Sequence, residues 1–215
     1  MRDIEKELSR YTSKIIDHAT LASILTNLGY KQINDKIVWL KKQGILTSLK
    51  SGLYIYNSTS KEQSISKEII ANTLLGPSYI SFDYALWYYS LIPESVYEVT
   101  SATTKRSKTF GTPFGTFSYR QIKKELFSLG LNIKSIRSGN FIIASKEKAL
   151  CDKVYYTKDI SIRSKKAMAD FLEDDLRIDM NELLGCDMKV FQAYFYITKS
   201  KKIGLLQKII EEIQE

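Results

Sequence analysis

The sequence predicts an α+β protein, and three observations lead to this fold class. Apolar residues recur at helical spacing near both ends of the chain, whereas the middle holds short apolar stretches typical of strands. Hydrophobic residues make up 44% of the 215 residues, enough to form a core. Only 10 Gly and 3 Pro interrupt the chain, so extensive disorder is not expected. The length suits two or three small domains, and three are predicted, at 1–60, 61–157 and 158–215.

The first domain begins with three predicted helices. They cover about residues 2–11, 20–27 and 31–43, and Thr20 is the expected N-cap of the second. Apolar residues at spacings of four and three form a stripe on the third helix that packs against the other two: Ile33, Ile37 and Leu40.

A hairpin follows the third helix. Residues 45–49 and 53–56 read as strands, and Lys50-Ser51-Gly52 reads as the tight turn between them. Three helices followed by a hairpin are the element order of a winged helix-turn-helix, so the sequence predicts this module for residues 1–60.

A winged helix-turn-helix places its third helix in the major groove of duplex DNA. Asn34 is the candidate for a bidentate contact to adenine. The alternative is a three-helix module that mediates protein contacts and binds no DNA. The candidate DNA-binding residues lie on the outer side of the third helix and in the hairpin turn: Lys31, Gln32, Asn34, Asp35, Lys36, Lys42, Lys50 and Ser51.

The middle domain is predicted to mix helices with strands. Helices are expected at about 66–75, 82–90 and 146–156, with Ser81 as the cap of the second. Strands are expected at about 78–81, 96–102, 115–120, 133–137 and 141–144.

A basic interval lies between Glu98 and Glu125, where no acidic residue occurs. Aromatic residues alternate with the cations there, which favours a nucleic-acid surface through phosphate pairing and base stacking. The alternative is a basic hairpin whose aromatic side chains point into the core. The cations of this candidate antitoxicity patch are Lys105, Arg106, Lys108, Arg120, Lys123 and Lys124.

Positive charge is concentrated in the first two domains. The net charge of +8 divides into +4 for residues 1–60, +5 for 61–156 and −1 for 157–215. This distribution favours a polyanionic partner for the first two domains. The last domain is predicted to be mostly helical, with breaks at Gly185 and Gly204 and a final amphipathic helix that packs on its own domain.

Three segments resemble the AbiEi antitoxins of type IV toxin-antitoxin systems. They are Gly52-Leu53-Tyr54, then Tyr79-Ile80-Ser81-Phe82-Asp83-Tyr84-Ala85-Leu86, then Ala144-Ser145-Lys146-Glu147-Lys148-Ala149-Leu150-Cys151-Asp152. Their order is that of the family over about residues 10–160, with departures at Tyr84 and at residues 88–92.

The resemblance implies two activities. The first domain would repress its own operon by binding promoter repeats, and the rest would neutralise a nucleotidyltransferase toxin encoded beside it. It leaves open whether a stable complex with the toxin forms. One alternative is a standalone winged-helix transcription regulator without a toxin.

A second alternative is a metal-dependent nuclease. It would need carboxylates to converge on a metal ion, and the candidates are Asp83, Glu98, Glu125 and Glu147. No P-loop, dinucleotide-binding fingerprint, paired-His metal motif or nucleophile elbow is present, so the sequence predicts a protein without enzymatic activity, cofactor or metal.

The single histidine, His18, is expected at a helix entry rather than in a metal site.

The cysteines and the hydropathy indicate a cytoplasmic location. Two distant cysteines make a disulfide framework improbable, and no apolar run is long enough for a transmembrane helix. We therefore expect a cytoplasmic protein that has no membrane partner.

Overall fold

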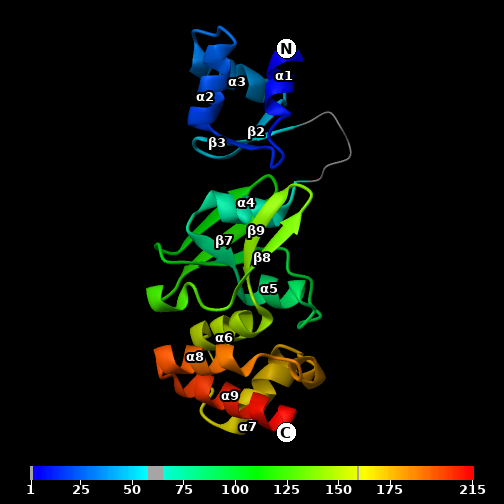
Figure 1. Ribbon diagram of the computed structural model, residues 1–215, viewed down its shortest axis with the longest axis vertical. Helices are drawn as coiled ribbons and strands as arrows, with labels where there is room; N and C mark the ends of the chain where they lie inside the picture. Colours follow the sequence, from blue (N-terminus) through cyan, green and yellow to red (C-terminus); the bar gives the residue numbers. More distant parts are fainter. Residues whose placement is uncertain (1, 58–64, 159) are drawn as a thin grey trace.

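The computed structural model describes residues 2–57, 65–158 and 160–215, and it confirms the α+β class. Three parts follow one another along the long axis in Figure 1. Helices and a small sheet from the N-terminal region lie at one end, a larger sheet lies in the middle, and the C-terminal helices lie at the other end.

The N-terminal region contains three helices and a three-stranded antiparallel sheet. Its elements are α1 (Arg2–Leu8), β1 (Ile15–Asp17), α2 (His18–Asn27), α3 (Ile33–Lys42), β2 (Leu46–Lys50) and β3 (Leu53–Tyr56). The strand order is β1-β3-β2. The helices pack on one face of this sheet through a separate apolar cluster that includes Leu8, Leu25, Leu40 and Tyr54.

The middle region is built on a six-stranded mixed sheet in the order β6-β7-β5-β4-β9-β8. Its strands are β4 (Ser78–Ile80), β5 (Val99–Thr103), β6 (Lys108–Thr112), β7 (Gly115–Gln121), β8 (Leu131–Ile136) and β9 (Gly139–Ala144). The pairs β4–β9 and β5–β7 are parallel, and the other pairs, including the central pair β4–β5, are antiparallel.

Helices cover the sheet, and further helices continue to the C-terminus. The middle ones are α4 (Lys67–Leu74), α5 (Phe82–Tyr88) and α6 (Lys146–Tyr156), with a 3-10 turn at Lys124–Leu126. The later ones are α7 (Lys165–Asp170), α8 (Met188–Thr198) and α9 (Lys201–Gln214), with a π-helical turn at Phe171–Asp175 and a 3-10 turn at Met180–Leu183.

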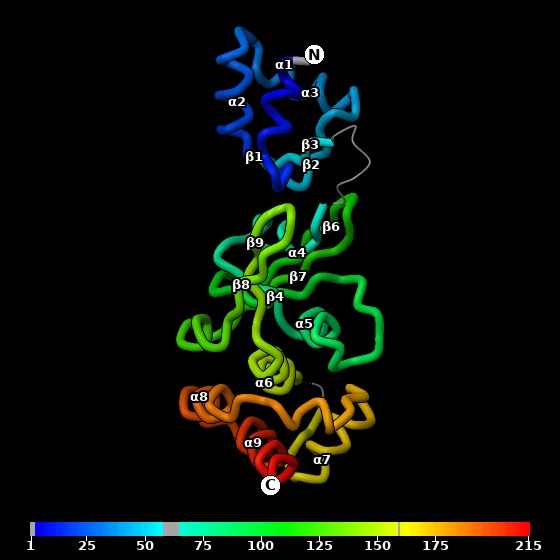
Figure 2. Tube along the Cα trace, turned by 45° about the vertical axis from the view of Figure 1, so that its right-hand side comes forward, coloured from blue at the N-terminus to red at the C-terminus, as the bar shows by residue number. Residues whose placement is uncertain are grey.

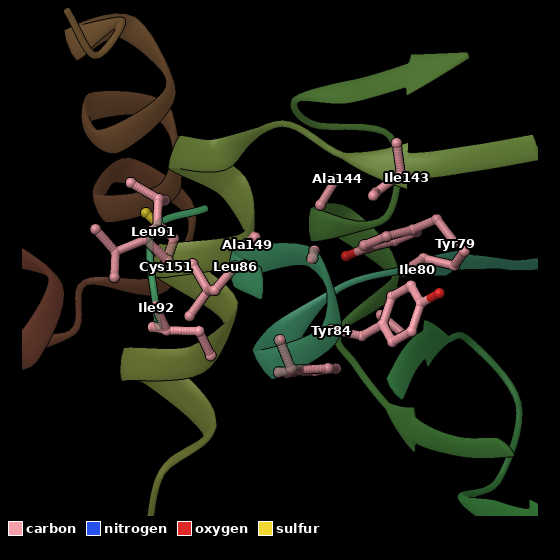
Figure 3. Close-up of a cluster of buried hydrophobic side chains, with 14 of the residues drawn as sticks. Tyr79, Ile80, Tyr84, Leu86, Leu91, Ile92, Ile143, Ala144, Ala149 and Cys151 are labelled. Carbon is pink, nitrogen blue, oxygen red and sulfur yellow. The ribbon is translucent and has the colours of Figure 1, made fainter. Parts of the chain in front are cut away.

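One continuous core joins the middle and C-terminal regions. Figures 1 and 2 both show α6 between the sheet on one side and α8 and α9 on the other. Figure 3 shows Leu86 of α5 beside Ile92 and beside Cys151 of α6. The same buried cluster extends to Tyr79 and Ala144 of the sheet. The C-terminal helices expected as a region of their own therefore share this core, and the apolar face of α9 packs within the chain.

Strand β3 is buried on both faces, because it separates the two cores. Tyr54 and Tyr56 face the N-terminal helices, whereas Leu53 and Ile55 belong to the core of the middle region. The N-terminal unit therefore rests on the middle region through its sheet, as the adjacent positions of β3 and α4 in Figure 1 indicate.

Several local predictions need correction. Asp17, and not Thr20, caps α2, because its carboxylate accepts the Thr20 N–H at 3.0 Å and the Thr20 hydroxyl at 2.7 Å. The short strand β1 and the edge strand β6 were not predicted.

The predicted helix break at Gly204 is also wrong. Gly204 lies inside α9, where the ring of Phe195 approaches so closely that an added Cβ would meet it at 3.0 Å. The break falls instead at Lys199, which adopts a left-handed conformation with φ +50°.

Candidate nucleic-acid interface

Helix α3 is fixed by one apolar side and leaves its other side open. Ile37 and Leu40 are buried in the N-terminal core, against residues of α1, α2 and the sheet. The helical period then places the intervening residues on the outside. The α3 helix lies near the end of the molecule in Figure 1, away from the six-stranded sheet.

The outer side of α3 carries most of the residues predicted to contact DNA. Val38 is half exposed, and no part of the described chain covers this helix side. Lys36 is partly buried. The other predicted residues from this helix and the turn before it are all exposed: Lys31, Gln32, Asn34, Asp35 and Lys42.

A shallow hollow of about 640 Å³ lies at the start of α3, and Lys31, Gln32 and Asp35 contribute to its wall. The ammonium group of Lys36 lies 3.8 Å from the ring centroid of Trp39 and 4.7 Å from that of Tyr30. These cation–π contacts hold the Lys36 charge at the surface beside two aromatic side chains. Trp39, which is exposed on α3, therefore positions a cation.

The hairpin turn faces away from α3. The Lys50 ammonium donates a 2.6 Å hydrogen bond to the Leu74 carbonyl, at the end of α4. Burial lowers the pKa of Lys50, and the charges of Lys108 and Lys105 lower it further. Ser51 is exposed next to Lys50. Because Lys50 binds the middle region, the hairpin does not share a cationic surface with α3, and we leave both turn residues out of the surface proposed below.

The basic interval divides into two groups. Lys105, Arg106 and Lys108 are exposed on β6 and the loop before it, and two of them lie near Lys50. The second group follows β7: an N–H of Arg120 donates to the Tyr156 carbonyl at 3.1 Å, and Lys123 lies over the Tyr155 ring. Lys124, the sixth cation of the interval, is exposed at the start of the 3-10 turn.

The aromatic residues of this interval mostly pack inward. Phe117 and Tyr119 are buried in the core, and the Tyr119 hydroxyl donates to the Ala71 carbonyl. Phe110 and Phe114 are partly buried against the same core. Two of the four rings are therefore unavailable for base stacking, as expected for a basic hairpin with its aromatic side chains inside.

A fully buried ion pair lies between the sheet and the C-terminal helices. Lys148 and Asp152, one turn apart on α6, are both 0% exposed, and the ammonium lies 2.5 Å from the carboxylate. Three hydroxyls also donate to Asp152: Ser81 at 2.7 Å, Tyr194 at 2.9 Å and Tyr79 at 3.0 Å. These five residues are called the Asp152 network below.

The Asp152 network assigns roles that sequence reasoning missed. Ser81 was expected to cap a helix; it does precede α5, but its hydroxyl binds Asp152 and makes no capping bond. Burial raises the pKa of Tyr79 and Tyr194, and the Asp152 charge raises it further, so both remain protonated donors. The i, i+4 spacing of Lys148 and Asp152 was the available signal.

The four carboxylates considered for a nuclease do not converge. Asp83 pairs with Lys153 at 2.6 Å, and Glu147 accepts the Asp187 N–H at 3.2 Å. Across residues 2–57, 65–158 and 160–215, no three His, Cys, Asp or Glu side chains lie close enough to hold a metal ion.

Three further sequence expectations concern His18, the cysteines and the membrane. His18 is the first residue of α2, as expected for a helix entry. Cys151 and Cys186 are buried free thiols, and burial raises the pKa of Cys186 to about 11. No helix within the described chain combines the length and apolar character needed to cross a bilayer.

These features define an α+β protein in which an N-terminal unit with an exposed helix packs on a region built on a mixed sheet. No family model matches the chain, and no curated protein matches it. The crystal structure of the RV2827C protein from Mycobacterium tuberculosis is similar to it, with a TM-score of 0.53 and 13% sequence identity. The match covers 99% of this chain and 80% of that one, so it shows a shared fold.

Proposed function

We propose that residues 2–57 form a winged helix-turn-helix that binds duplex DNA, with α3 as its recognition helix. The observation that carries the proposal is the open outer side of α3, whose inner side is fixed in the core. The element order α1-β1-α2-α3-β2-β3, with a small antiparallel sheet, supports the assignment.

The residue types on α3 suit a contact with DNA. Lys31 and Gln32 stand just before the helix, and Asn34 lies in its first turn, which is the part of a recognition helix that reaches base edges. Asn matches the donor and acceptor pair of adenine. Lys31, Lys36 and Lys42 supply charge for phosphates, and Asp35 supplies the one opposing charge among the residues predicted to bind.

We further propose that the protein is an antitoxin that represses its own operon and neutralises a nucleotidyltransferase toxin. The support is the resemblance to the AbiEi antitoxins, together with the placement of its segments. Residues 79–86 and 144–152 are adjacent in space, since Tyr79 and Ser81 bind Asp152. Two of the three segments that carry the resemblance thus form one structural unit, which is expected if they define a family fold.

Binding to the DNA upstream of the protein's own gene tests the first proposal. The double variant Lys31→Ala/Asn34→Ala should lower affinity in a mobility-shift assay at least tenfold, because one good base contact contributes about 1–3 kcal/mol. Lys208→Ala in α9 removes the same charge at the opposite end of the molecule and serves as the control. Equal affinity of the double variant and the parent would refute the assignment of α3.

A further inference from the structure

A second hollow, of about 650 Å³, opens on the middle region and has no part in the proposed DNA contact. Strands β5 and β7 form one wall, and α5 and α6 with the residues after it form the other. Thr100 and Ser118 are register partners on these strands, and Arg120, two residues further, points to the same side. The volume lies in the range of small-molecule pockets.

The charges that line this hollow are mostly positive. Arg120, Lys153 and Lys158 contribute cations, and Asp83 contributes the carboxylate. The Asp83 carboxylate is paired with Lys153 at 2.6 Å, so its charge is compensated. An anionic ligand would therefore meet two further cations there, Arg120 and Lys158.

Arg120 is held in place by two contacts that leave some of its N–H donors unused. Its guanidinium carbon lies 5.3 Å from the centroid of the Phe82 ring, and one N–H binds the Tyr156 carbonyl. An arginine carries several N–H donors in a planar fork that matches two oxygens of a phosphate. The remaining donors of this fork are available to a ligand.

Two hydroxyls in the wall can donate to a ligand. The Ser107 oxygen accepts the Gln121 N–H at 2.9 Å, and the Tyr156 oxygen accepts the Lys123 N–H at 2.9 Å. Since each oxygen already accepts a backbone N–H, its own hydrogen is directed elsewhere. Burial raises the pKa of Tyr156 to about 12, which keeps that hydrogen in place at neutral pH.

The backbone beneath Arg120 is strained. Phe82 has φ +57°, a left-handed conformation that is unusual for an aromatic residue. Such a conformation is energetically unfavourable and is found at ligand sites more often than elsewhere. Here it places the Phe82 ring under Arg120 and edge-on to Tyr156, at 6.2 Å between ring centroids.

We propose that this hollow binds a small molecule that carries a phosphate group, with Arg120 as its principal contact. A guanidinium fork, further cations and hydroxyl donors match the several acceptor oxygens of a phosphate. The hollow is large enough for a nucleotide as well as for a sugar phosphate. The phosphate is the part of the ligand that the wall recognises.

Calorimetric titration of the full chain tests this site with three probes: inorganic phosphate, ribose 5-phosphate and adenosine monophosphate. At least one probe should bind, and the strongest shows which phosphate source the hollow prefers. Arg120→Gln should weaken that binding at least tenfold, and Ser118→Ala several-fold. Arg137→Gln, an exposed arginine at the distant β8–β9 turn, should bind like the parent.

Two outcomes would overturn the proposal: no binding of any probe at millimolar concentration, or equal binding by the parent and the Arg120→Gln variant. If Arg120→Gln fails to fold, Ser118→Ala decides, because Ser118 is only partly buried and its truncation removes one hydroxyl. The Lys31→Ala/Asn34→Ala variant should bind the probe normally, which separates this site from the DNA interface.

Discussion

The Asp152 network provides a sharp test of how the core is held together. The variant Asp152→Asn keeps the shape of the side chain and an acceptor oxygen for the hydroxyls of Ser81, Tyr79 and Tyr194. It removes the negative charge that lies 2.5 Å from the Lys148 ammonium. The ammonium would then be fully buried without a counter-ion.

Breaking a buried ion pair by removing one partner costs about 3–5 kcal/mol, since the other charge stays desolvated. Native proteins have a free energy of unfolding of about 5–15 kcal/mol, so this loss would remove a large share of the stability. The double variant Lys148→Met/Asp152→Asn carries no buried charge and keeps the amide acceptor. It should be more stable than Asp152→Asn alone, by about 2 kcal/mol or more.

Urea denaturation at neutral pH, followed by far-UV circular dichroism, measures both effects. Asp174→Asn is the control, because Asp174 is an exposed acid in the C-terminal region and its variant should unfold like the parent. A free energy of unfolding for Asp152→Asn within about 1 kcal/mol of the parent's would refute the role given to the buried ion pair. A double variant no more stable than the single one would refute it as well.

Three further predictions concern stability and the basic group. Gly130→Ala should destabilise the protein by about 1–3 kcal/mol more than Gly29→Ala in the same urea assay. Both glycines are left-handed, but only at Gly130 would an added Cβ meet a neighbour, the Lys148 side chain at 3.0 Å. Equal losses of stability would contradict this steric explanation. Thermal stability should fall as the pH rises above about 10. Burial raises the pKa of Tyr79, Tyr84, Tyr119 and Tyr194, so above that pH the folded state binds more protons than the unfolded chain. A constant melting temperature from pH 8 to pH 11 would contradict this. Replacing Lys105, Arg106 and Lys108 together by Glu should reduce growth rescue on co-expression with a neighbouring toxin gene by more than it reduces DNA binding, and unchanged rescue would remove this group from the proposed antitoxin function.

Local patterns predicted many elements closely. Helix α6 was expected at 146–156 and is observed at Lys146–Tyr156, because the Ser145 hydroxyl caps it by accepting the Lys148 N–H. Helix α3 followed from the spacing of Ile37 and Leu40. In contrast, β6 is an exposed edge strand with a glycine and two threonines, so its sequence carries no apolar alternation.

The direction of the hairpin could not be predicted from local patterns. The sequence suggested a free wing with Lys50 near DNA, whereas the structure places Lys50 against Leu74. One signal was present: Leu53, Tyr54, Ile55 and Tyr56 form an unbroken apolar run, which is typical of a strand covered on both faces. A hairpin with one face in solvent would alternate polar and apolar residues.

The Asp152 network also needed tertiary information. Its members come from β4, the start of α5, α6 and α8, and Tyr194 lies 42 residues after Asp152 in the chain. The sheet order, with two parallel pairs among antiparallel ones, is likewise set by packing between distant segments. Sequence reasoning therefore located the residues of the candidate DNA surface on α3 but not the pairing at the centre of the protein.

The separation of Tyr194 from Asp152 has a consequence for synthesis. A ribosome produces Lys148 and Asp152 well before α8, so these two residues leave it without the Tyr194 hydroxyl and without the apolar cover of α8 and α9. A chain that stops before residue 194 keeps that surface of α6 open to water and to proteases. The helix proposed to bind DNA, by contrast, is made within the first 42 residues.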